Sequence, residues 1–395
     1  MSTATQSRAI EPAAAKSNTH RPWWLVSLEF VALSLFAIAA LEGFCRICGV
    51  GGQEFLYPDP IMGCRQIPGK QVIWRFEGFS DDLLNSLGRR DVEHALAKPP
   101  GVTRVVVLGD SATEGLQVPL KDNYCRLLES MLNSRGNGKY EVLNFGCSSY
   151  STGQQVLLFE KQAAQYRPDV TVVLYVRGAA LQNAYNPYKK AVEPRPYFYL
   201  DGRGKLQEDD SILHEQAAAL RPNPVMDFLR CHSRIYGIFS QANLSLSIHE
   251  PLYNKVRGWL TKLASLPATA FASDSTRTPL GARASRQHQG RLLYPPPDVW
   301  QVTRALFHRL NEDCRRQGSK LVIMVFPNVV DDPILARQIP DLEAMGRSEG
   351  FGTMDLTQAF RAEPDVHALF LQFHFSAAGH QVVARQLAGY LQDHR

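Results

Sequence analysis

The sequence has little excess charge of either sign. Its 395 residues carry 43 Lys and Arg against 38 Asp and Glu, which gives a formal net charge of +5. Proteins that bind nucleic acid usually gather basic residues on one element, and no such cluster is present here. The 45% hydrophobic and 21% charged content excludes collagen-like, coiled-coil and wholly disordered chains. We therefore expect a globular protein without a nucleic-acid partner.

Signals for disulfides, metals and cofactors are also scarce. The seven cysteines are odd in number and have no repeated spacing. Cys45 and Cys48 form a C-x-x-C pair, but no second pair accompanies it, as a zinc site would need, and no strand–helix context suggests a redox motif. His367, His374 and His380 lack an accompanying pattern of carboxylates. We interpret the thiols as structural or incidental, and we predict no metal and no cofactor.

Long hydrophobic runs are lacking except for one near the N-terminus. Residues 22–41 read PWWLVSLEFVALSLFAIAAL, with Glu29 as the single charge. About 20 apolar residues span a bilayer, and Trp23 and Trp24 stand at one edge, where aromatic rings favour the interface. We interpret residues 22–42 as a transmembrane anchor. A cleaved signal peptide, with an A-x-A pattern at 37–39, and a buried core helix are the alternatives.

Charge on the two sides of this run predicts its orientation. Three basic residues and one acidic residue precede it: Arg8, Lys16, Arg21 and Glu11. The positive-inside rule then makes residues 1–21 a cytoplasmic tail and places the main domain outside the cytoplasm, in a periplasm or the extracellular space. Residues 43–100 are expected to form a juxtamembrane connector.

From about residue 102, apolar runs alternate with amphipathic segments. The expected strands are 103–108, 141–144, 170–176, 320–327 and 353–356. The expected helices are 124–132, 155–166, 302–316, 341–348 and 378–391. Strands that are apolar throughout imply a parallel sheet covered on both faces. We predict a three-layer α/β/α sandwich over residues 101–395, with a mostly parallel sheet.

The alternation breaks at about residues 185–297, which we interpret as an insertion. Residues 194–202 suggest a hairpin arm, and residues 224–266 are helical in pattern, with aromatic and aliphatic side chains. We expect these helices to pack on the core, with a lid or a membrane surface as the alternative. Residues 272–291 contain four arginines and are interpreted as a solvated loop, with lipid binding as the alternative.

Three positions suggest chemistry at the carboxyl ends of the strands, where sites form in open α/β sheets. Ser111 directly follows the first strand, Gly146 follows the second, and His374 precedes the last helix. A serine nucleophile needs an adjacent base, and the oxyanion needs backbone N–H donors, which turns at Ser111 and Gly146 can supply. Taken singly, each signal also fits a structural role: Gly-Asp-Ser is a good turn, and Ser376 beside His374 is a plain helix cap.

Taken together, the segments resemble the SGNH/GDSL hydrolase family. The similar blocks are VVVLGDSATEGLQVP (105–119), VLNFGCSSYSTGQQ (142–155) and HFSAAGHQVVA (374–384), preceded by NSLGRRDVEHALAKPPGVTR (85–104), which resembles the lead-in of membrane-anchored members. The resemblance covers roughly residues 55–185 and 297–395. It implies a flavodoxin-like sheet, Ser111 as nucleophile with its N–H in the oxyanion hole, Gly146 as a second oxyanion donor, and His374 as base.

Two family residues are replaced. The third block normally carries Gly-Asn, whose amide is an oxyanion donor, but this chain has Gly178-Ala179. The last block normally has an Asp two or three residues before the His, where this chain has Gln372 and Leu371. One missing oxyanion donor costs about 100–1,000-fold in rate, and a missing triad charge about 10⁴-fold.

The remaining residues offer substitutes, and three hypotheses stand. Asn183 lies near the third block, and Gln372, Asp365 or Glu363 could orient His374. The first hypothesis is an extracytoplasmic ester hydrolase or acyl transferase that uses a Ser111–His374 dyad. The second is a degenerate member that binds an ester or glycan without turnover, and the third is an anchored structural or assembly protein. The resemblance implies an acyl-ester substrate, such as an acetylated cell-surface glycan, and nothing in the sequence identifies a protein partner.

Overall fold

The computed structural model describes residues 22–51, 55–134, 138–180, 183, 194–215, 224–239 and 299–394. The chain divides into two compact units, Met1–Cys48 and Gly49–Arg395.

The first unit contains one long apolar helix, α1 (Trp23–Ile47). Its 25 residues are long and apolar enough to cross a membrane, by length and composition, a test that a signal sequence near an N-terminus also passes. None of its membrane-length window is buried, which argues against the alternative of a buried core helix. The helix runs five residues beyond the predicted end of the anchor at residue 42.

The second unit is built on a five-stranded parallel sheet in the order β11-β10-β7-β5-β6. Its strands are β5 (Val102–Gly109), β6 (Lys139–Gly146), β7 (Val170–Tyr175), β10 (Lys320–Val325) and β11 (Gly352–Asp355). The first strand of this sheet along the chain, β5, lies between the second, β6, and the third, β7, which is the flavodoxin-like order expected from the sequence resemblance. The chain therefore changes direction across the sheet at β5 and β7, and ligands bind at the carboxyl side of such a switch point.

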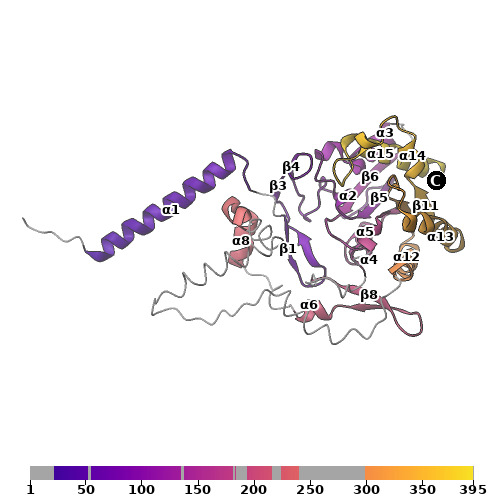
Figure 1. Cartoon of the computed structure of the whole chain (residues 1–395), viewed down its shortest axis with the longest axis horizontal. Helices are drawn as coiled ribbons and strands as arrows, with labels where there is room; N and C mark the ends of the chain where they lie inside the picture. The colour runs from indigo at the N-terminus through magenta and orange to yellow at the C-terminus, as the bar shows by residue number, and fades with distance from the viewer. Residues whose placement is uncertain are drawn as a thin grey trace, which may run out of the picture. The chain divides into compact units, whose positions relative to one another are not determined.

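Helices cover both faces of this sheet (Figure 1). One face packs against α3 (Tyr124–Ser134), α14 (Thr357–Arg361) and α15 (Ala377–Asp393), and the other against α4 (Thr152–Lys161), α12 (Val299–Arg316) and α13 (Pro333–Glu349). Side chains alternate between the two cores along each strand, so that Val105 and Val107 enter one and Val106 and Leu108 the other. The predicted three-layer α/β/α sandwich is confirmed.

The largest departures from the predicted helix bounds occur at α13 and α4. Helix α13 begins at Pro333, eight residues before the predicted start, because Asp332 caps the first turn and Pro340 is accommodated inside the helix. The Asp332 carboxylate accepts from the Ile334 N–H at 2.9 Å, and proline at the first helical position needs no N–H acceptor. The segment predicted as one helix over 155–166 divides into α4 and a 3₁₀ turn at Ala163–Tyr166.

The segment predicted as a connector forms two antiparallel hairpins of the second unit. They are β1 (Leu56–Asp59) with β2 (Gly63–Gln66), and β3 (Gln71–Trp74) with β4 (Ser80–Leu83). The segment is bound to the sheet domain by Arg90, which is fully buried and donates to the carbonyls of Glu114, Gly115 and Val118. Residues 55–92 therefore belong to the folded domain and do not simply link it to α1.

Part of the predicted insertion is described. A hairpin is present but extends beyond the predicted range 194–202: β8 (Tyr197–Leu200) pairs with β9 (Leu206–Asp209), and the short helix α6 (Ser211–Glu215) follows. Helix α8 (Pro224–His232) confirms the first part of the helical prediction. The rest of that prediction after residue 239, and the arginine-containing stretch 272–291, lie outside the described residues.

Candidate functional site

Ser111 stands at the carboxyl end of β5, on the first residue of the short helix α2 (Ser111–Glu114). The Asp110 carboxylate caps this helix by accepting from the Ala112 N–H at 3.0 Å. The strand can turn directly into the helix because Gly109 has no side chain: a Cβ there would lie 1.9 Å from Thr113 Oγ1. The local sequence therefore fixes Ser111 at the sheet edge where a parallel-sheet site forms.

His374 lies next to Ser111, as the sequence predicts for a base and its nucleophile. The distance from His374 Nε2 to Ser111 Oγ is 2.8 Å, which is hydrogen-bond reach. The histidine sits on a tight turn in which the Leu371 N–H donates to the His374 carbonyl at 2.8 Å. Ser376 caps the following helix α15. This capping role is compatible with the contact between His374 and Ser111.

Glu77 completes this group of side chains. Its Oε2 lies 2.7 Å from His374 Nδ1, and its Oε1 accepts from the N–H groups of Phe373 and His374 at 2.6 and 2.9 Å. Burial of the side chain opposes its charged form, but the hydrogen bonds from Phe373 and His374 outweigh that effect and hold the pKa of Glu77 below its usual range. The carboxylate is therefore ionised at neutral pH, facing the imidazole that contacts Ser111.

Glu77 is not among the residues predicted from the sequence to orient His374. The Asp365 carboxylate accepts from the backbone of His367 and Ala368 at 3.0 and 3.2 Å, and Gln372 is exposed on the turn, so neither is the partner of the imidazole Nδ1. Glu363 pairs with Arg385. The correction has a physical reason: Glu77 precedes His374 by 297 positions and reaches it from the turn between β3 and β4. No local spacing encodes that contact.

Fewer backbone N–H groups are free to bind an oxyanion than the sequence predicts. The Ser111 N–H meets no acceptor among the described residues. The Gly146 N–H, predicted as a second donor, points at Asn144 Oδ1 at 2.9 Å. Only glycine fits at position 146, because a Cβ would lie 2.3 Å from the Glu114 nitrogen. One N–H is thus available and the other is shared with a side chain.

The Asn183 side chain forms hydrogen bonds to two helices. Its Oδ1 accepts from the Gly153 N–H at 2.8 Å, and its amide nitrogen donates to Thr303 Oγ1 at 3.4 Å. The side chain therefore ties the start of α4 to α12 and does not supply the amide donor that Ala179 lacks. Ala179 itself lies in a short helix, α5 (Arg177–Ala180).

The carboxylate of Glu114 is fully buried and connects the sequence blocks 105–119 and 142–155. Its Oε1 accepts from Gln66 Nε2 at 2.6 Å, and its Oε2 accepts from both the N–H, at 2.8 Å, and the hydroxyl of Ser148. Burial raises the pKa of Glu114, while the bonds from Ser148 and Gln66 oppose that rise. Gln66 also donates to the Gly146 carbonyl at 3.0 Å. This network fixes the loop after β6 against α2.

His380 is buried beside the site. Its Nδ1 accepts from the Tyr124 N–H at 3.2 Å, and its ring stacks on the Tyr124 ring. Burial lowers the pKa of His380 to about 3, with Arg90 and His374 adding to the effect. The ring is therefore neutral. No group of three or more His, Cys, Asp or Glu side chains that could hold a metal ion occurs in the part of the chain that the structure describes.

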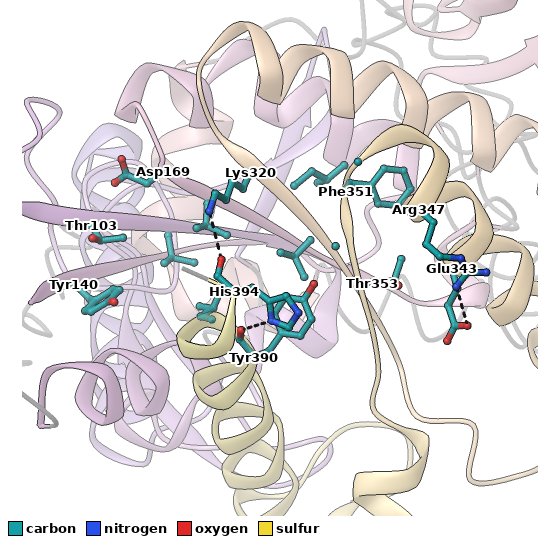
Figure 2. Close-up of a pocket in the computed structure, with 17 residues that line it drawn as sticks. Thr103, Tyr140, Asp169, Lys320, Glu343, Arg347, Phe351, Thr353, Tyr390 and His394 are labelled. Carbon is teal, nitrogen blue, oxygen red and sulfur yellow. Dashed lines mark hydrogen bonds and ion pairs between the residues drawn. The ribbon is translucent and has the colours of Figure 1, made fainter. Parts of the chain in front are cut away.

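A cavity of about 830 Å³ lies at the other end of the sheet (Figure 2). Its walls include the amino ends of the strands, at Thr103, Val170 and Lys320, and the last turns of α13 and α15. The polar groups around it interact with one another: Lys320 Nζ donates to the His394 carbonyl at 3.4 Å, and His394 Nδ1 contacts the Tyr390 carbonyl at 2.9 Å. Ser111, His374 and Glu77 are not among its lining residues.

Comparisons with known proteins extend the description of the fold. No protein-family model matches the sequence, and no curated protein matches it. Among solved structures, the chain is similar to TesA (10% identity, 74% of this chain and 99% of that one, TM-score 0.39). It is also similar to a lipase/acylhydrolase from Enterococcus faecalis (11%, 74% and 96%, TM-score 0.37) and to the acetyl xylan esterase AlAXEase (11%, 73% and 99%, TM-score 0.36). At such low identities these similarities concern the fold alone.

Proposed function

We propose that this protein is a membrane-anchored serine ester hydrolase or acyl transferase that uses Ser111, His374 and Glu77 as a catalytic triad. The observation that carries the proposal is the continuous chain of contacts from Ser111 Oγ through the imidazole to the Glu77 carboxylate, at 2.8 and 2.7 Å. This arrangement replaces the dyad considered from the sequence. It also removes one of the two reasons for a degenerate site, because a charged partner for His374 is present.

In the proposed mechanism, Ser111 Oγ attacks the ester carbonyl carbon while His374 Nε2 takes the hydroxyl proton. The ionised Glu77 holds the other imidazole nitrogen and stabilises the imidazolium. The tetrahedral oxyanion accepts from the Ser111 N–H, and His374 returns the proton to the leaving alkoxide as the C–O bond breaks. Water or an acceptor hydroxyl then attacks the acyl-enzyme with His374 again as base, which releases the acyl product and restores Ser111.

The proposal includes a slow oxyanion step. The Gly146 N–H is shared with Asn144, and an alanine stands where the family has an asparagine donor. One missing donor corresponds to about 100–1,000-fold in rate. Degenerate ligand binding therefore remains the second candidate function, and the specific observation in its favour is this reduced set of donors.

The proposed setting is the membrane surface. Helix α1 acts as the anchor, and the basic residues before it keep the N-terminus in the cytoplasm and the hydrolase domain outside. The substrate is an acyl ester, and an acetylated glycan is one such ester. Ser111, His374 and Glu77 can supply the chemistry for an acetylated glycan and for other acyl esters.

The test uses the full-length chain reconstituted in nanodiscs. Wild type should hydrolyse p-nitrophenyl acetate, and Ser111→Ala should lose at least about 10³-fold in kcat/KM, because the nucleophile is removed. The control is Thr353→Ala at the amino end of the sheet, which should retain wild-type rates. A fluorophosphonate should label the wild type at Ser111, located by peptide mass spectrometry.

Equal hydrolysis by wild type and Ser111→Ala, together with no fluorophosphonate adduct, would overturn the proposed activity. Binding of an ester without hydrolysis or labelling would instead establish the second candidate function.

A further inference from the structure

Four large apolar side chains stand exposed on the two turns that carry Glu77 and His374. We call them the apolar rim: Phe76, Phe79, Leu371 and Phe373, with exposed fractions of 71%, 52%, 37% and 65%. Phe76 directly precedes Glu77, and Phe373 directly precedes His374. Large apolar side chains that gather on the exposed surface of a folded domain often mark a binding site. Here that surface adjoins the groups that are proposed to react.

The rim has a defined shape because its two turns are bound to each other. The Glu77 carboxylate accepts from the Phe373 and His374 N–H groups, which joins the turn between β3 and β4 to the turn before α15. Leu371 lies against Gly78, where an added Cβ would be only 2.9 Å from Leu371 Cδ1. The same contacts that orient the imidazole therefore place the rim beside it.

Neighbouring side chains also limit the freedom of the rim. The Phe76 ring packs edge-on against Trp74 at 6.3 Å between centroids, and the Arg75 guanidinium lies over the Phe79 ring at 5.3 Å. Rings held in this way lose little further rotamer freedom when a ligand covers them. Their burial by an apolar ligand is then favourable.

The chemistry of the two turns favours hydrocarbon over sugar. Both oxygens of Glu77 are already engaged, and the Arg75 guanidinium lies over the Phe79 ring. Gln372 is the one uncharged polar side chain between Leu371 and His374. A sugar hydroxyl needs placed donors and acceptors for recognition, whereas a hydrocarbon chain needs only apolar area. The four side chains of the apolar rim supply apolar area.

We infer that the apolar rim binds the hydrocarbon chain of the acyl group, so that the preferred substrates are esters of medium or longer acyl chains and not acetyl esters. This inference rests on the proposed function, because it selects among the acyl esters that Ser111 would cleave. The chain lies across Phe76, Phe79, Leu371 and Phe373 while the ester carbonyl meets Ser111.

The experiment compares p-nitrophenyl hexanoate with p-nitrophenyl acetate, using the full-length chain in nanodiscs. A fully buried methylene is worth about 0.8 kcal/mol, or about fourfold in kcat/KM. Wild type should prefer hexanoate by at least about tenfold, and Phe76→Ser/Phe373→Ser should reduce that ratio about tenfold. The matched control is Leu96→Ser, whose side chain is 53% exposed, next to Arg104 near the start of β5. It should leave the ratio unchanged, which also corrects for partitioning of the esters into lipid.

Two outcomes would overturn the inference while leaving the proposed function intact: a wild-type preference for acetate, or an equal chain-length ratio in wild type and the double variant. If Ser111→Ala hydrolyses both esters as fast as wild type, the proposed function fails instead. Saturation transfer from the protein to the methyl protons of hexanoate, with empty nanodiscs as blank, then decides the rim by itself. A signal that the double variant loses supports the rim, and an equal signal in both proteins refutes it.

Discussion

The two ends of the five-stranded sheet are built in opposite ways. At the carboxyl end, turns from three distant parts of the chain place His374 between Ser111 and Glu77, at 2.8 Å from the Ser111 hydroxyl and 2.7 Å from the Glu77 carboxylate. At the amino end, a cavity of about 830 Å³ is lined by strand starts and helix ends, and its polar groups bind one another (Figure 2). This cavity thus lies at the end of the sheet away from Ser111, His374 and Glu77.

The two ends differ because different parts of the chain meet there: loops at the carboxyl end, and strand starts and helix ends at the amino end. Loops at the carboxyl ends of parallel strands are free to carry polar side chains, because the sheet's hydrogen bonds end there. A cavity by itself provides apolar area but no activated group. The position of these three side chains therefore follows from the topology of the sheet, and the amino-end cavity does not mark it.

Among variants at the two ends of the sheet, Glu77→Gln is expected to lower the esterase rate the most. The amide keeps an oxygen for the backbone N–H groups of Phe373 and His374 but removes the charge that stabilises the imidazolium. We expect kcat/KM for an ester to fall by about 10²–10⁴-fold with little change in fold. The rates are measured with p-nitrophenyl esters, and the near-ultraviolet circular dichroism spectrum reports on folding.

The control at the amino end of the sheet is Glu343→Gln. This substitution removes a carboxylate that lines the cavity, and the variant should retain wild-type rates. Asp365→Asn should also have little effect, since Asp365 does not contact the imidazole. A Glu77→Gln protein with unchanged rates would show that His374 works without a charged partner.

An intermediate effect concerns acid stability near the site. Burial lowers the pKa of His380 to about 3, against about 6.5 for an unfolded histidine, so the unfolded chain binds the proton first. Stability from this group is complete above pH 6.5 and is lost as the pH falls toward 3. We expect the contribution lost between pH 7 and pH 4 to be about 3 kcal/mol, measured by urea unfolding at several pH values.

The matched variant for this prediction is His380→Gln, which has no ring to protonate. Its free energy of unfolding should fall less steeply with acid than that of the wild type, since carboxylates such as Glu77 contribute equally to both proteins. Parallel pH curves for the two proteins would contradict the burial of a neutral His380.

The smallest effect is expected at the amino end. Arg347 and Glu343 approach to 4.0 Å with exposed side chains, and such surface pairs contribute about 0–1 kcal/mol. Arg347→Ala should change the free energy of unfolding by about 0.5 kcal/mol or less and the esterase rate by less than about twofold. A tenfold change in rate would mean that the two ends of the sheet are coupled, and the contrast between them would need revision.

Local sequence patterns predicted most of the fold. The β-branched run of β5 and the apolar runs of β7 and β10 indicated strands, since such runs are typical of strands buried on both faces. Helix α13 was predicted too short, because Pro340 suggests a helix end when its neighbours are unknown. The segment before β5 was predicted as a connector, because its short hairpins have weak periodicity.

For the candidate site, the sequence alone determined that Ser111 and His374 stand at the carboxyl side of the sheet, because each adjoins an element with a clear local pattern. Only the tertiary structure decided which carboxylate faces the imidazole. Glu77 lies on a turn outside the sheet, and the Asn144 side chain occupies the Gly146 N–H. Such contacts depend on how hairpins pack against the sheet, and packing is a property of the whole chain that no short stretch of residues encodes.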